Sequence, residues 1–147
     1  MSDDKIMLAL LKRLETFSPT SPIGTVQIAE YGGETFTKPT PKSVHDGTGL
    51  WIEPRWFPSE PSRVGFTGAV SNYRGYLQAS CCIHRGKWAA YYAGILASQV
   101  AAHFPKALKL TEDDVTVKVS GDTGAGSALE ADGELRIPVI IRYQALA

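Results

Sequence analysis

Two residues on a predicted strand have the types and spacing that a metal site would use. Cys82 and His84 are two positions apart in "YRGYLQASCCIH", so on a strand their side chains point to the same face. Thiolate and imidazole both bind zinc, but a closed zinc site needs four ligands. His45 and His103 fall in a loop and at a helix end, and no second cysteine pair completes the set. We therefore expect no metal site and no cofactor.

Cys81 and Cys82 are the only cysteines of the chain. Neighbouring strand residues point to opposite faces, so a disulfide between them would be strained. A catalytic thiol needs a base beside it in a cleft, whereas a cysteine on a regular strand is usually a small packing residue. We expect two free thiols in a reducing compartment, with a packing role.

The segment "GDTGAGS", Gly121–Ser127, contains the Asp-Thr-Gly-Ala sequence of aspartic protease active sites. Those enzymes need two aspartates that share a proton. Here Ser120 and Gly121 precede Asp122 where the proteases have an apolar pair, and the chain has no second Asp-Thr-Gly or Asp-Ser-Gly. The segment also lacks the Lys-Ser/Thr of a phosphate-binding loop. We expect a flexible hairpin loop, no catalytic residue and no enzyme.

The charges are balanced overall but unevenly distributed. Fifteen Lys and Arg residues face fifteen Asp and Glu residues, so the molecule as a whole is not a polyanion-binding protein. Residues 61–111 carry six basic and no acidic side chains, whereas the excess is −2 in residues 1–60 and −4 in residues 112–147. The centre of the chain is electropositive and its flanks compensate.

The apolar pattern predicts the elements that position these residues. Ile6, Leu10, Leu14 and Phe17 recur at helical spacing until "SPTSP" ends the helix. Pro54 confines the strand around it to an edge or a bulge. The expected elements are a helix over about 3–17, a short strand in 25–31, strands over 50–57, 73–84, 115–120 and 135–145, and an Ala-rich helix over 87–104. The core side of the second helix is expected to carry Trp88, Tyr92, Ile95, Leu96 and Val100.

This order predicts an α+β fold in which a mainly antiparallel mixed sheet is packed by the N-terminal helix and the Ala-rich helix. With 147 residues, the chain is expected to form one domain, 1–147, with long loops at about 58–72 and 121–133. No stretch approaches the roughly 18–20 apolar residues of a membrane span. Acids at Asp3 and Asp4 stand where a signal peptide carries positive charge, so we expect synthesis in the cytoplasm and no membrane partner.

Three stretches carry a resemblance to a known family. They are "GYLQ" at Gly75–Gln78, "HFP" at His103–Pro105 at the end of the Ala-rich helix, and "RIPVIIRY" at Arg136–Tyr143. In this order they resemble the tail terminator, or tail completion, proteins of tailed bacteriophages, which include the minor tail protein U type. The resemblance spans most of the chain and departs at Pro58–Asn72 and Gly121–Gly133.

The resemblance implies a structural virion protein at the tail–neck junction. Such a protein would assemble as a homo-hexameric ring on the end of the tail tube, stop its polymerisation and join it to the head. The implied partners are further copies of the chain, the tail tube protein, the head–tail connector or neck protein, and DNA that passes non-specifically through the lumen. A head-closure or neck connector protein is the alternative.

A closed ring needs two different patches that meet between subunits. Arg85 and Lys87 lie in the Gly-containing turn "HRGKW" before the Ala-rich helix, and such turns are usually exposed. We expect them to contact acids of the next subunit. The two candidate acidic sets are Glu112, Asp113 and Asp114, and Asp132 with Glu134.

Overall fold

The N-terminal helix has the charge pattern that its dipole favours. The computed structural model describes residues 2–31, 36–59, 62–64 and 70–146, and α1 spans Ser2–Glu15. Asp3 and Asp4 occupy its first turn, and Lys12 and Arg13 its last. The predicted apolar residues at positions 6, 10, 14 and 17 are all buried. The helix ends two residues earlier than predicted, because the amides of residues 16 and 17 bond to carbonyls three residues back.

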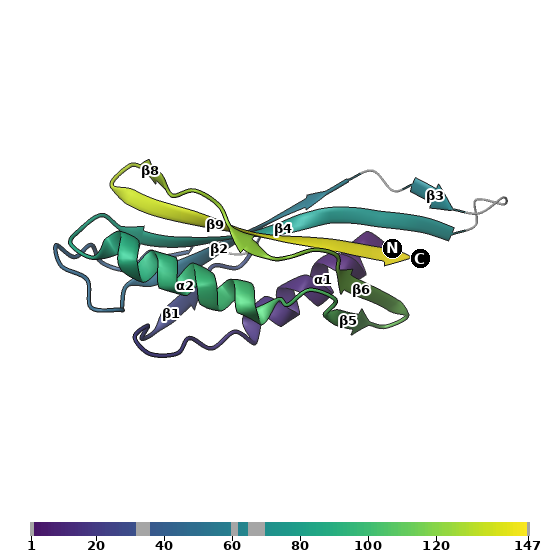
Figure 1. Cartoon of the computed structure of the whole chain (residues 1–147), viewed down its shortest axis with the longest axis horizontal. Coiled ribbons are helices and arrows are strands. Elements are labelled where there is room, and N and C mark those ends of the chain that lie inside the picture. Colours follow the sequence, from purple (N-terminus) through teal and green to yellow (C-terminus); the bar gives the residue numbers. More distant parts are fainter. Residues whose placement is uncertain (1, 32–35, 60–61, 65–69, 147) are drawn as a thin grey trace.

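One mixed sheet forms the centre of the described structure (Figure 1). Its main path runs β1-β2-β4-β9-β6-β5, with β3 paired to β4 and both β7 and β8 paired to β9. The strands are β1 Val26–Ile28, β2 Leu50–Pro58, β3 Ser62–Val64, β4 Val70–His84, β5 Lys109–Glu112, β6 Val115–Val119, β7 Gly124–Ala125, β8 Leu129–Ala131 and β9 Glu134–Leu146. Among the strands of the described residues, only β1 and β2 pair in parallel. The predicted α+β class with a mainly antiparallel sheet is confirmed.

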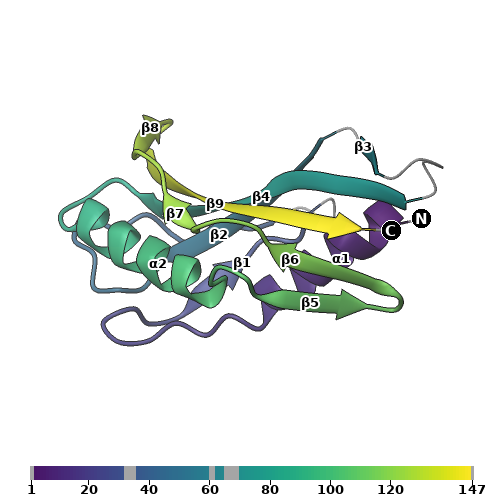
Figure 2. The same ribbon diagram turned by 45° about the vertical axis from the view of Figure 1, so that its right-hand side comes forward.

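Both helices cover the same face of this sheet (Figures 1 and 2). The second helix, α2, spans Ala89–His103. Its small residues bring it close to β4 and β9, and its buried positions are Ala89, Ala93, Leu96, Ala97 and Val100. The reciprocal bonds between Arg13 and His103 fix its C-terminal end to α1: the guanidinium donates to the His103 carbonyl at 2.8 Å, and His103 Nε2 donates to the Arg13 carbonyl at 2.8 Å.

Pro54 and Pro138 lie at strand positions where no bond between neighbouring strands requires a backbone N–H. In β2, the pairing with β1 ends at Ile52, so Pro54 is on a free edge, as predicted. In β9, the carbonyl of Pro138 accepts a bond from the Gly126 amide at 2.7 Å. The nitrogen and the carbonyl of one strand residue point to the same side, so the nitrogen of Pro138 faces the connection between β7 and β8 rather than β4.

The segments predicted as long loops contain short strands. β3 lies in 58–72, and β7 and β8 lie in 121–133. These strands have two or three residues each and pair with β4 or β9. They are too short to show an alternation of apolar and polar residues, so the sequence does not predict them. Residues 60–61 and 65–69 of the first segment lie outside the described part of the chain.

Candidate interaction surfaces

The two cysteines lie on opposite faces of the sheet, as predicted. Cys81 belongs to the core between sheet and helices, whereas the Cys82 thiol donates to Glu53 Oε2 at 3.4 Å on the open face, the one opposite the helices. Both are free and buried. Burial raises the pKa of Cys81 to about 12 and raises that of Cys82 as well. Neutral buried thiols are unreactive, which fits the packing role.

His84 shares the open face with Cys82 but is engaged elsewhere. Its Nε2 donates to the Pro39 carbonyl at 2.8 Å, so that nitrogen has no free lone pair for a metal. The described residues contain no cluster of three or more His, Cys, Asp or Glu side chains that could hold a metal ion.

An ion-pair network holds the segment around Lys38 over the open face. Arg136 binds Glu53 and, at 3.0 Å, Glu134, and Lys38 Nζ lies 2.6 Å from Glu134. Lys38 also lies 5.8 Å from the ring centre of Trp51, which is fully buried there. Burial alone would raise the pKa of Glu134, but the bonds from Lys38 and Arg136 hold it below its ordinary value. The Glu134 carboxylate is therefore engaged within its own chain.

The turn with Arg85 and Lys87 is exposed, as the sequence predicts for a Gly-containing corner. The Arg85 amide donates to the Gly133 carbonyl at 2.8 Å, and its guanidinium lies 3.8 Å from Glu130. Lys87 Nζ lies 5.3 Å from the ring centre of Trp88. Asp132, in the exposed β8–β9 turn, therefore belongs to the same end of the molecule as Arg85.

The other acidic set lies at the opposite end, in and beside the β5–β6 turn (Figure 1). Glu112 accepts from Lys12 at 2.9 Å, and Asp114 accepts from Lys5 at 2.6 Å. The hydrogen bond from Lys5 is the main reason that the pKa of Asp114 lies below its ordinary value. The carboxylate of Asp113 is highly exposed and lies 4.0 Å from Lys5 Nζ, farther than that of Asp114.

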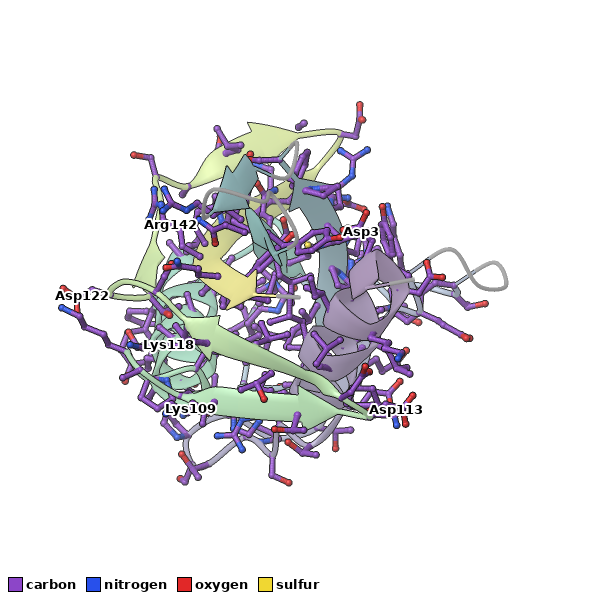
Figure 3. The ribbon with its side chains drawn as sticks, turned by 90° about the vertical axis from the view of Figure 1, so that its right-hand side faces the viewer. Asp3, Lys109, Asp113, Lys118, Asp122 and Arg142 are labelled. Carbon is purple, nitrogen blue, oxygen red and sulfur yellow. The ribbon has the colours of Figure 1, made fainter. Side chains whose placement is uncertain are left out.

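Figure 3 shows that Lys109, Lys118 and Arg142 line one side of this end, and that Asp3 and Asp113 lie on the other. Lys109 and Lys118 are direct partners across β5 and β6. Like charges directly opposite each other disfavour strand pairing, so sheet stability does not account for this pair.

Asp122 is exposed on the same side as these cations (Figure 3). Its loop is held by backbone-directed bonds: the Thr123 hydroxyl donates to the Phe104 carbonyl at 2.7 Å, and Gly124 and Ala125 pair with β9. The expected hairpin is not found at these residues, because β6 and β7 do not pair with each other but pair in succession with β9. The segment between them is a surface connection along the sheet.

The expectation that Trp88 belongs to the core was wrong. Its side chain is 56 % exposed, as is that of Tyr91. The helix begins at Ala89, two residues later than predicted, and Trp88 has a φ of 73°, so Trp88 does not follow the helical repeat. The alanines, rather than the large residues, fill most of the buried side of α2.

Sequence reasoning also missed a pocket between α1 and β1. It measures about 230 Å³, and its lining residues are Leu8, Leu11, Lys12, Leu14, Glu15, Ile28, Ala29, Glu30, Tyr31 and Pro54. The one signal of the pocket in the sequence is that Leu8 and Leu11 are apolar but fall outside the buried stripe of α1.

Within the described residues, no helix is both long and apolar enough to cross a bilayer. No curated protein matches the sequence. One solved structure, which carries no descriptive name, is similar in fold: it shares 22 % identity with a TM-score of 0.70, over 99 % of this chain and 96 % of the other. The model of the phage tail terminator protein family matches residues 5–143. With nearly the whole chain covered, from within α1 to Tyr143 of β9, the chain belongs to the family of phage tail terminator proteins.

Proposed function

We propose that this protein is the tail terminator that assembles as a ring, with six copies, on the end of a phage tail tube. The ring stops tube polymerisation and presents its other side to the neck of the head, at the tail–neck junction of the virion. The family match over residues 5–143 carries the proposal. The role is structural, with no reaction assigned to any residue.

The positions of the charged sets support a head-to-tail contact. Arg85 and Lys87 lie at one end of the molecule and Glu112–Asp114 at the other (Figure 1). A contact between unlike ends is heterologous and can close a ring. Asp132 and Glu134 lie at the same end of the molecule as Arg85. A contact of Arg85 with these acids of the next subunit would therefore require the same end of two subunits to meet. We therefore favour the set Glu112–Asp114, in which Asp113 is the acid that is least engaged within the chain.

The basic side formed by Lys109, Lys118 and Arg142 suits DNA that passes through the ring. Clustered cations bind phosphates without sequence preference and release counterions, so such contacts weaken as salt rises. The like-charged pair of Lys109 and Lys118 supports this assignment, because it has no use in the sheet.

Electron microscopy of particles made without the protein tests the function. A missing terminator leaves tails that are abnormally long or unjoined to heads, and added protein restores their length. Tails of normal length beside heads that leak DNA would instead assign the protein to head closure or to the neck.

A further inference from the structure

The exposed large apolar side chains gather mainly at two separate places. Of the six among the described residues, only Leu129 lies outside them. The first place, the aromatic corner, comprises Val44, Trp88 and Tyr91 at the start of α2, where Val44 and Lys87 form a β-bridge. The second is the α1–β1 pocket, where Leu8 is 42 % and Tyr31 40 % exposed. Isolated exposed apolar residues are ordinary, but two such groups indicate binding surfaces.

The fold does not require a tryptophan at position 88. The residue precedes α2 with a left-handed backbone and makes no side-chain capping bond. Gly or Asn adopts this conformation more easily than a bulky side chain, and strained residues of this kind gather at functional positions. Tryptophan is also among the residues that contribute most to binding at protein interfaces. The exposed indole is therefore the natural centre of a contact.

The α1–β1 pocket is suited to receive an aromatic ring. Apolar side chains from both elements line it, among them Leu11 and Ile28. An apolar cavity of about 150 Å³ already holds a benzene molecule, and this pocket measures about 230 Å³.

The charges around the two surfaces are complementary. Lys87 lies against Trp88, and Arg85 lies two residues before Lys87 in the same turn. The charged residues that line the pocket are Lys12, which pairs with Glu112 at 2.9 Å, and Glu15 and Glu30, which have no ion-pair partner among the described residues. A cation that accompanies the indole would thus meet a carboxylate, which favours this orientation over others.

The two surfaces of one chain do not meet. α2 has 15 residues, which corresponds to about 22 Å, and its far end is the one that contacts α1 through His103 and Arg13. The aromatic corner at its near end is therefore free to reach only another molecule.

We propose that Trp88 of one copy inserts into the α1–β1 pocket of the next copy, with Lys87 directed at Glu15 and Glu30. Each copy offers both surfaces, so the contact is heterologous and repeats from one copy to the next. Its closure into a ring rests on the proposed function, and the pairwise contact requires only two copies of the chain. Lys87 is thereby assigned to the acids of the pocket, and Arg85 is the cation of the corner that remains for the Glu112–Asp114 set. The indole supplies the apolar centre that a contact of charges alone lacks.

Three variants test the contact. Trp88→Asn removes the indole and suits the left-handed backbone, and Leu8→Arg places a cation at the pocket. Leu129→Asn is the matched control, because Leu129 is 61 % exposed and lies outside both surfaces. Native mass spectrometry, with and without tail tubes, should show self-association weakened roughly tenfold or more in the first two variants and unchanged in the control. Thermal unfolding establishes that all three are folded.

A mixture of the two defective variants distinguishes a heterologous contact from a symmetric one. Trp88→Asn retains an intact pocket and Leu8→Arg an intact indole, so one contact forms between them and the mixture yields one-to-one dimers but no rings. The absence of these dimers, rings formed by folded Trp88→Asn, or a wild type that does not self-associate even on tubes would each overturn the proposal. Wild-type rings that fail to end tail growth would contradict the terminator function and leave the contact standing.

Discussion

At the scale of single residues, the adjacent cysteines form a matched pair for testing the two faces of the sheet. Cys81→Ser places a hydroxyl in the apolar core, and this should lower the free energy of unfolding by about 1–3 kcal/mol. In Cys82→Ser, the hydroxyl can donate to Glu53 as the thiol does, so the loss should be below about 1 kcal/mol. Urea unfolding measures both. Equal losses would contradict the assignment of the two thiols to different environments.

Glu134 gives a prediction for the dependence of stability on pH. Its folded-state pKa is below the ordinary value of 4.5, so the ionised form stabilises the fold above that pH. This contribution should be lost as the pH falls below 4.5 and through the folded-state pKa. In Glu134→Gln the loss of stability on acidification should be smaller, as measured by urea midpoints at neutral and acidic pH. An unchanged pH profile would show that the network with Lys38 and Arg136 does not stabilise the ionised carboxylate.

At the scale of elements, Gly75 fixes how closely β2, β4 and β9 approach. A Cβ atom there would lie 2.5 Å from the Phe57 carbonyl oxygen and 2.7 Å from the Tyr143 hydroxyl. That hydroxyl also accepts a bond from Trp56 Nε1 at 3.1 Å. Gly75→Ala should therefore destabilise the protein by about 1–3 kcal/mol, measured by thermal or urea unfolding. Gly94→Ala on α2 is the control, because a Cβ there meets no atom within 4 Å.

The elements with a pattern of their own could be predicted from the sequence. The spacing of residues along the chain predicts the buried apolar stripe of α1 and the alternation of buried and exposed residues in β6. Pro54 likewise predicts that its part of β2 lies at a sheet edge. The left-handed backbone and the exposure of Trp88 could not be predicted, because they depend on the preceding turn. In that turn the Lys87 amide donates to the Ser43 carbonyl, and the Lys87 carbonyl accepts from the His45 amide. The α1–β1 pocket likewise depends on tertiary placement, since Tyr31 and Leu8 are distant in sequence.

At the scale of the whole molecule, the unlike charges at its two ends make a prediction about assembly. In Arg85→Glu with Lys87→Glu, the corner would repel the acids of the next subunit, so a folded protein should fail to form rings or to end tail growth. Exposed ion pairs contribute only about 0.2–1 kcal/mol each, but a ring repeats every contact around its circumference. High salt should weaken wild-type rings for the same reason.

The matched control for this double variant is Lys109→Glu with Lys118→Glu, which reverses two paired cations of β5 and β6 at the other end of the molecule (Figure 1). Native mass spectrometry should find rings in the control but not in the corner variant, because Lys109 and Lys118 lie on the side of the β5–β6 end away from Asp113 (Figure 3) and are not assigned to the proposed contact. The control should instead lose the salt-dependent binding of DNA, measured by filter retention at low and high salt. If the corner variant forms rings at both salt concentrations, Arg85 and Lys87 are not contact residues. Their charge would then belong, with that of Lys109 and Lys118, to a surface that faces DNA.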